Sequence, residues 1–217
     1  MVNSLPTPYY DHDGITIYHA DCRDILPLLP QVDLVLTDPP YGIGKIFKGS
    51  AAGGWKKQRS QQEKRNEWDA VAPQDVVDLI CNQFAKSKNV IWGGNYFNLP
   101  ASRCWLVWNK PRRNFSLSDA EIAWTNQDSL VRVFDGPAYE REASHPTQKP
   151  LKLMTWCIEW SKGAELIIDP FMGSGTTLVA AKLLGKKAIG IEREEKYCRI
   201  AVERLAQGNL FSEEVKW

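Results

Sequence analysis

The sequence lacks the long apolar segments of a membrane protein and the leader of an exported one. No apolar run in its 217 residues approaches the ~20 residues that span a bilayer. The first residues, Met1 to Pro6, do not show the charged and apolar regions of a signal peptide. We therefore expect a cytoplasmic protein with no membrane partner.

Cysteine and histidine are also scarce. The five cysteines are scattered without a C-x-x-C pair, and the three histidines do not lie at metal-ligand spacing. This usage favours reduced thiols over a disulfide framework, and it argues against a protein metal site.

The composition is that of a globular protein, with 43% apolar and 24% charged residues. The length fits a single domain, residues 1–217, that buries a full core. The net charge of +1 is uninformative, but seven cations and only two anions lie between Tyr41 and Trp68. These cations are Lys45, Lys48, Lys56, Lys57, Arg59, Lys64 and Arg65.

We call residues 42–68 the basic segment. It contains five glycines and has no clear helical or strand period, which predicts a mobile loop. Its excess of positive charge predicts a polyanionic partner, with a merely solvated loop as the alternative.

Strand-like and helix-like patterns alternate along most of the chain. The expected strands are 15–19, 32–37, 89–92, 104–108, 120–124, 130–134, 165–168 and 188–191. The expected helices are a short one capped by Asp21, one starting at Pro73, and 151–160, 176–184 and 194–206. The β-α-β-α run in the last third implies parallel strands, so we expect a mixed, mostly parallel, doubly wound α/β sheet.

A glycine-rich turn, Asp169 to Thr177, follows the strand 165–168. Gly173 and Gly175 let the backbone approach a ligand closely, and the helix that follows attracts a negative group to its free amides. Glu192, at the end of the next strand, is placed to accept hydrogen bonds from ribose hydroxyls. The third glycine of the dinucleotide fingerprint is missing, so a nucleoside with a carboxylate tail, such as S-adenosylmethionine, fits better than a pyrophosphate. A glycine-rich turn without a ligand is the alternative.

The tetrapeptide Asp38-Pro39-Pro40-Tyr41 follows the strand 32–37. An exocyclic amine of adenine or cytosine is a poor nucleophile, because its lone pair is delocalised into the ring. Two acceptors on its hydrogens, the Asp38 carboxylate and the Pro39 carbonyl, would stabilise the charge that develops during attack on a methyl sulfonium. Tyr41 offers a ring on which a base that has left the duplex can stack. A tight turn at a strand end is the alternative interpretation.

On these motifs the chain resembles the DNA amino-methyltransferases, which methylate the exocyclic amine of adenine or cytosine. Residues 38–41 match the catalytic motif of that family and residues 169–177 its cofactor motif. His145-Pro-Thr-Gln-Lys-Pro150 matches the motif that precedes the cofactor strand. The motif order resembles the beta subgroup, in compact forms similar to phage or prophage products, and the resemblance spans residues 15–206.

The resemblance implies a Rossmann-like methyltransferase sheet of seven strands, one of them antiparallel, with a circularly permuted motif order. It implies S-adenosylmethionine as cofactor, direct in-line methyl transfer to a flipped base in double-stranded DNA, and a role in restriction-modification within a bacterial cell or phage-infected host. Asp rather than Ser at position 38 favours adenine over cytosine in this family. Methylation of cytosine at N4 stays open as the alternative.

The implied functional residues fall into two groups. The catalytic residues are Asp38, Pro39, Pro40 and Tyr41. The cofactor-binding residues are Asp21, Cys22, Asp38, Thr147, Lys149, Asp169, Phe171, Gly173, Ser174, Gly175, Thr176, Thr177 and Glu192. The seven cations of the basic segment are expected to bind DNA phosphates.

The chain departs from the family in the size of its target-recognition region, which is usually sizeable in members with tight sequence specificity. Here only the short stretch 135–144 and the basic segment are available for target recognition. Recognition is therefore short, relaxed, or shared with a second subunit in a homodimer.

Three further classes of protein stay open from the sequence. They are an RNA methyltransferase, a protein-amide methyltransferase, and an inert module that binds DNA or the cofactor. Protein glutamine methyltransferases typically have Asn in place of Asp38 and carry the cofactor motif first, which argues against that class.

Overall fold

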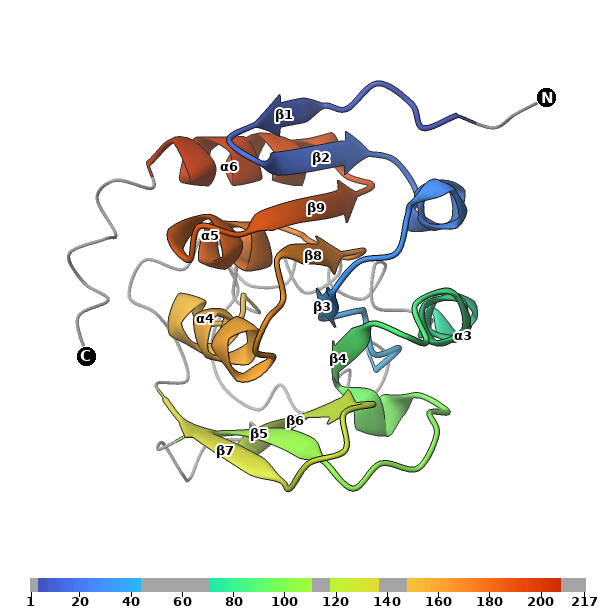
Figure 1. Ribbon diagram of the computed structural model, residues 1–217, viewed down its shortest axis with the longest axis vertical. Helices are drawn as coiled ribbons and strands as arrows, with labels where there is room; N and C mark the ends of the chain where they lie inside the picture. The colour runs from blue at the N-terminus through green and yellow to red at the C-terminus, as the bar shows by residue number, and fades with distance from the viewer. Residues whose placement is uncertain (1–3, 44–70, 111–117, 137–147, 208–217) are drawn as a thin grey trace, which may run out of the picture.

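The structure is a computed structural model that describes residues 4–43, 71–110, 118–136 and 148–207. These residues form a single nine-stranded sheet with helices on both faces (Figure 1). The basic segment beyond Ile43, all seven of its cations, Thr147, and residues 137–144 of the expected recognition stretch lie outside the described residues.

The strands lie in the order β1-β2-β9-β8-β3-β4-β6-β5-β7. Their bounds are β1 Tyr10–His12, β2 Ile15–His19, β3 Leu34–Thr37, β4 Lys88–Trp92, β5 Trp105–Asn109, β6 Ala120–Thr125, β7 Arg132–Asp135, β8 Leu166–Asp169 and β9 Lys187–Glu192. The five central strands β2, β9, β8, β3 and β4 are parallel. Strand β6 runs antiparallel to both of its neighbours, β4 and β5, and β1 runs antiparallel to β2.

This topology confirms the mostly parallel, doubly wound α/β class. The sheet has nine strands, whereas the resemblance implies seven and the sequence patterns predict eight, and two strands, β6 and β1, are antiparallel rather than one. The difference arises at the edges, where β1 is only three residues long and carries no alternating apolar pattern that would identify it in the sequence.

The helices cover the sheet on both sides. They are α1 Cys22–Ile25, α3 Gln74–Gln83, α4 Leu151–Trp160, α5 Thr176–Leu183 and α6 Glu195–Ala206, with short 3₁₀ turns η1 Leu26–Leu28 and η3 Gly94–Tyr96. In Figure 1, α4, α5 and α6 lie on one face, and α1 and α3 lie on the other. None of the helices in the described ranges is long and apolar enough to cross a bilayer.

The two faces of the sheet bury two separate apolar clusters. Leu34 and Leu36 of β3 belong to the cluster beneath α4, α5 and α6, whereas Val35 between them belongs to the cluster beneath α1 and α3. All three are fully buried. This two-sided burial explains why the central strands read as continuous apolar runs rather than as alternating ones.

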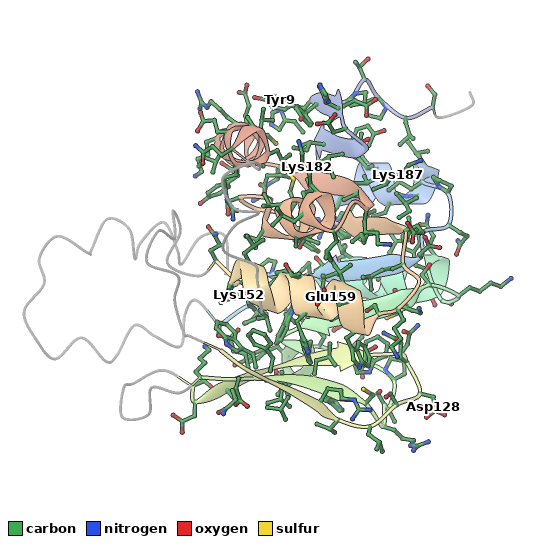
Figure 2. The ribbon with its side chains drawn as sticks, turned by 60° about the vertical axis from the view of Figure 1, so that its left-hand side comes forward. Tyr9, Asp128, Lys152, Glu159, Lys182 and Lys187 are labelled. Carbon is green, nitrogen blue, oxygen red and sulfur yellow. The ribbon has the colours of Figure 1, made fainter. Side chains whose placement is uncertain are left out.

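The outer sides of the helices carry the charges. In Figure 2, Lys152 and Glu159 mark the outward side of α4 and Lys182 that of α5. The Lys182 ammonium lies 3.0 Å from the Asp13 carboxylate, which ties α5 to the turn between β1 and β2.

One edge of the sheet collects every predicted motif found in the described ranges. The carboxyl ends of the parallel strands β2, β3, β4, β8 and β9 meet there. Because β6 is antiparallel, its first residues, including Glu121, lie at the same edge. Ligands of doubly wound sheets bind outside the carboxyl ends of the strands, so this edge is where a functional site is expected.

Candidate active site at the carboxyl edge of the sheet

Asp38 is the first residue after β3, and both of its carboxylate oxygens are engaged. Oδ1 accepts a hydrogen bond from the Tyr41 hydroxyl at 2.5 Å, and Oδ2 accepts one from the Lys149 ammonium at 2.6 Å. Pro39 is buried behind it, and Pro40 and Tyr41 are half-buried. The prolines hold the chain stiff enough for residues 38 and 41 to face each other within one turn.

The Tyr41 ring lies against the end of β4. Gly93 has a left-handed φ of +66°, and a Cβ at this position would come within 2.1 Å of the Tyr41 ring. The ring also stacks on Tyr96, with centroids 4.9 Å apart and an interplanar angle of 16°. Burial raises the pKa of the Tyr41 phenol well above its ordinary value, so the hydroxyl remains a hydrogen-bond donor to Asp38.

Lys149 lies just before α4 and reaches into the same place. Besides Asp38, its ammonium contacts the Tyr41 hydroxyl at 3.2 Å and the Glu121 carboxylate of β6 at 3.0 Å. Its side chain is only 7% exposed. The prediction that Lys149 binds the cofactor carboxylate stays a prediction, and the contacts found here are with the catalytic motif instead.

Asp169 joins three elements below this site. Its carboxylate accepts hydrogen bonds from Thr37 of β3 at 2.8 Å, from Thr177 of α5 at 2.6 Å, and from the Phe171 amide at 3.1 Å. Asp169 is 3% exposed, and burial raises its pKa to about 6. The geometry gives Asp169 a positioning role for the turn, whereas its predicted direct contact with a cofactor stays untested.

The glycine turn has the shape that the sequence predicts. Gly173 and Gly175 have φ values of +50° and +79°, which favour glycine. A Cβ on Gly175 would lie 2.7 Å from Ala201 of α6, whereas the space beside Gly173 is open. Helix α5 begins at Thr176 without a side-chain cap. Its first amides are therefore suited to an anionic ligand group.

Glu192, at the end of β9, closes the other side of this turn. Its two oxygens accept hydrogen bonds from the Gly173 amide at 3.1 Å and from the Glu194 amide at 2.7 Å. Burial raises the pKa of Glu192. The carboxylate therefore lies beside the glycine turn, and its predicted contact with a ribose stays a prediction.

Asp21 stands at the end of the neighbouring strand β2 and caps α1, as predicted. Its Oδ1 accepts a hydrogen bond from the Arg23 amide at 2.9 Å. Cys22 is buried, and burial raises the pKa of its thiol to about 12, so it stays a neutral thiol. The backbone of Ala20 bonds to that of Glu192 at 3.1 Å, which brings the two predicted nucleoside contacts to adjacent strand ends.

The remaining predicted residues of the turn are held by groups of the protein. Arg204 of α6 donates to the Ser174 carbonyl at 2.7 Å and to the Thr176 hydroxyl at 3.1 Å. Ser174 also donates to Gln148 at 3.1 Å, which links the turn to the 145–150 motif. Phe171 is half-buried beside these residues.

Sequence reasoning missed Glu121, Gly93 and Tyr96. Glu121 carries a signal, because it is the sole charged residue of the expected strand 120–124. Its other carboxylate oxygen pairs with Lys110, so a charged network, Lys110–Glu121–Lys149–Asp38, runs along this edge.

Among the described residues, no group of three or more His, Cys, Asp or Glu side chains has an arrangement that could hold a metal ion.

The chain matches known proteins over most of its length. A family model described as DNA methylase matches residues 56–203. The type II methyltransferase M2.MboI of Moraxella bovis is 28% identical over 255 residues, covering 91% of this chain and 90% of the relative. The DNA adenine methyltransferase YhdJ of Escherichia coli K12 is 26% identical over 257 residues, covering 94% of this chain and 87% of the relative.

Solved structures show the same fold. The M1.HpyAVI–SAM complex has a TM-score of 0.56 and 25% identity, covering 88% of this chain and 98% of that one. The cytosine-N4-specific PvuII DNA methyltransferase has a TM-score of 0.57 and 13% identity, covering 97% and 93%. At that identity, the second likeness concerns the fold alone.

Proposed function

The chain belongs to the DNA methylase family of N6- and N4-amino-methyltransferases, and from this premise we propose that it methylates the exocyclic amine of adenine in double-stranded DNA. The observation that carries the proposal is the placement of Asp38 and Tyr41 beside the glycine turn and Glu192 at one sheet edge. When bound, S-adenosylmethionine supplies the electrophilic methyl group.

Asp38 acts on the amine as an acceptor rather than as a strong base. Its carboxylate takes a hydrogen bond from the amine and stabilises the positive charge that appears on nitrogen as the bond to the methyl carbon forms. The Pro39 carbonyl takes the second amine hydrogen. The neutral amine attacks first and loses its proton afterwards, so no base is needed before transfer.

The residues at the carboxyl edge fit S-adenosylmethionine. The uncapped start of α5 suits the carboxylate of its methionine part, and the open space at Gly173 admits a ligand close to the backbone. Glu192 suits the ribose hydroxyls, and Asp21 with Cys22 suits the adenine, because these residues end the two adjacent strands β9 and β2.

Adenine is the proposed base for two reasons. Position 38 is Asp, and the relative YhdJ carries the name of a DNA adenine methyltransferase. The base must leave the duplex to reach Asp38, and stacking on an aromatic ring such as Tyr41 offsets ~1–3 kcal/mol of the unstacking cost. Cytosine-N4 methylation is the second candidate, because the same acceptors serve either amine.

Labelled methyl transfer to unmethylated double-stranded DNA tests the proposal, with nucleoside mass spectrometry to identify the product and Asp38→Ala as the control. We expect N6-methyladenine from the wild-type protein and a loss of about 100-fold or more in kcat for Asp38→Ala. N4-methylcytosine as the product would show that the target base is cytosine rather than adenine. Undiminished transfer by Asp38→Ala would refute the mechanism.

A further inference from the structure

The ammonium of Lys149 has three acceptors, and they come from two different parts of the fold. Asp38 at 2.6 Å and Tyr41 at 3.2 Å belong to the motif after β3. Glu121 at 3.0 Å comes from the antiparallel strand β6. Because the Lys149 side chain is 7% exposed, these three groups take the place of water around its charge.

This cation presents a problem for the proposed chemistry. Lys149 lies on the same carboxylate that must stabilise the positive charge growing on the amine nitrogen. A cation within a few ångströms of that nitrogen repels the positive charge that grows on it. The same cation also offsets the negative charge of Asp38, which is meant to stabilise the amine during methyl transfer. A second anion beside Lys149 would offset this opposing charge.

Glu121 is that anion, and it is held firmly. One oxygen contacts Lys149, and the other pairs with Lys110, which directly follows β5. The Glu121 side chain is 26% exposed. Glu121 pairs across the sheet with Trp108, so its position is set by the register of β6 on β5.

We propose that Glu121 is a positioning residue for methyl transfer, which holds the Lys149 cation so that the Asp38 carboxylate is free to stabilise the target amine. This inference rests on the proposed function and deepens it. When the amine donates to Asp38, Lys149 keeps a full anionic partner in Glu121 and need not compete for the catalytic carboxylate.

The protonation states agree with this role. Burial alone would lower the pKa of Lys149, but Asp38, Tyr41 and Glu121 together raise it well above its ordinary value. Burial opposes ionisation of Glu121, yet Lys149 and Lys110 hold its pKa below the ordinary value. Lys149 therefore acts as a fixed cation and does not serve as the base that removes a proton from the amine.

The test begins with Glu121→Gln, which keeps the shape and removes the charge. We expect kcat to fall by about 10- to 100-fold, while the Kd values for S-adenosylmethionine and DNA stay within about twofold of wild type. Glu159→Gln is the matched control, because Glu159 is an exposed residue on the outward side of α4 (Figure 2) and its substitution makes the same change in net charge. We expect Glu159→Gln to retain the wild-type kcat.

A second variant separates positioning from simple support of the fold. The rate is measured at saturating S-adenosylmethionine, so that a cofactor contact of Lys149 does not limit it. Adding Lys149→Met to Glu121→Gln removes the cation that Glu121 compensates, so the double variant should transfer methyl groups faster than Glu121→Gln alone. A merely structural Glu121 predicts the reverse, because the second substitution would add damage. A double variant as slow as or slower than Glu121→Gln overturns the inference.

The same assay distinguishes this inference from the proposed function. Wild-type transfer with an unchanged kcat in Glu121→Gln overturns the role of Glu121 and leaves the proposed function intact. No transfer by the wild-type protein overturns both. Thermal unfolding of each variant is followed in parallel, so that a lowered kcat is compared only among folded proteins.

Discussion

At the residue scale, Tyr41 has two parts with separable roles. Its hydroxyl donates to Asp38 at 2.5 Å, and its ring stacks on Tyr96. The first contact fixes the direction of the carboxylate, while the ring is the surface proposed for the flipped base. A substitution that removes one part and keeps the other therefore tests each role.

Tyr41→Phe and Tyr41→Ala should differ in the step they impair. Tyr41→Phe keeps the ring and loses one donor to Asp38, so we expect kcat to fall by less than about tenfold and DNA affinity to be unchanged. Tyr41→Ala also loses the stacking surface, which weakens binding of the flipped base by ~1–3 kcal/mol. Single-turnover kinetics and fluorescence of 2-aminopurine at the target position measure the two effects. Equal losses of base binding in both variants would contradict the stacking role.

The sequence predicts some site residues better than others, for a physical reason. Asp38 and Tyr41 meet within one turn, so the tetrapeptide alone indicates their proximity. Glu121 meets Lys149 only because β6 is antiparallel and pairs in one register with β4 and β5. The lone charge in the strand 120–124 marks Glu121 as unusual, but its partner depends on the pairing of distant strands and leaves no local pattern in the sequence.

At the element scale, Gly93 allows the end of β4 to support the loop after β3. A Cβ at residue 93 would overlap the Tyr41 ring at 2.1 Å, in addition to the strain of a φ of +66°. Gly163 has a similar φ of +77°, but its missing Cβ faces open space. The two glycines thus form a natural pair for comparison.

Gly93→Ala should lose both stability and activity, whereas Gly163→Ala should lose stability alone. The left-handed conformation costs each variant about 1–2 kcal/mol of unfolding free energy. Gly93→Ala additionally displaces the Tyr41 ring, so we expect its kcat to fall by about 100-fold. Urea unfolding and methyl transfer assays measure the two losses. A Gly93→Ala variant as active as Gly163→Ala would show that the ring position does not matter.

Asp169 links β8, β3 and α5, and its burial makes the stability of this junction depend on pH. Burial raises the pKa of Asp169 from 3.8 to about 6. Between these values the folded protein holds a proton that the unfolded chain has released. The stability that this bound proton contributes is therefore fully present below about pH 3.8 and is lost as the pH rises through about 6.

Asp169→Asn should remove this pH dependence. The amide stays neutral, and the hydroxyls of Thr37 and Thr177 can rotate to satisfy it. Relative to wild type, we expect the variant to gain about 1.4 kcal/mol of unfolding free energy between about pH 5 and pH 7.5, which is roughly half of the ~3 kcal/mol that the full pKa shift from 3.8 to about 6 represents. Denaturant unfolding of both proteins at the two pH values gives this difference. The same difference at both pH values would argue against a buried, titrating Asp169.

At the scale of the whole molecule, the sequence predicts the fold class because periodicity is a local property. The helix 151–160 and the strand 15–19 appear with the expected bounds. The order of the strands is set by packing between distant segments, and only the β-α-β-α run, with its crossover rule, constrains it from the sequence. The edge strand β1 follows from pairing with β2 rather than from its own three residues.

The charge distribution gives a prediction for the entire protein in complex with DNA. The basic segment adjoins Tyr41, and its cations lie outside the described residues. If Lys56, Lys57 and Arg59 contact phosphates, replacing all three with alanine lowers the magnitude of the slope of log Kd against log salt by about 0.9 for each lost contact. The matched control replaces Lys162, Lys186 and Lys187 with alanine. Lys162 lies before β8, Lys186 just before β9, and Lys187 is the first residue of β9, so all three lie at the opposite edge of the sheet.

Both triple variants remove the same net charge, so a general change in the field of the protein affects them equally. A phosphate contact instead affects the slope of the first variant alone, because only bound cations release counterions from DNA. Fluorescence anisotropy with a labelled duplex over a range of salt concentrations measures both slopes. An unchanged slope in the first variant would remove the basic segment from the DNA interface, whereas the same decrease in both would assign the effect to net charge.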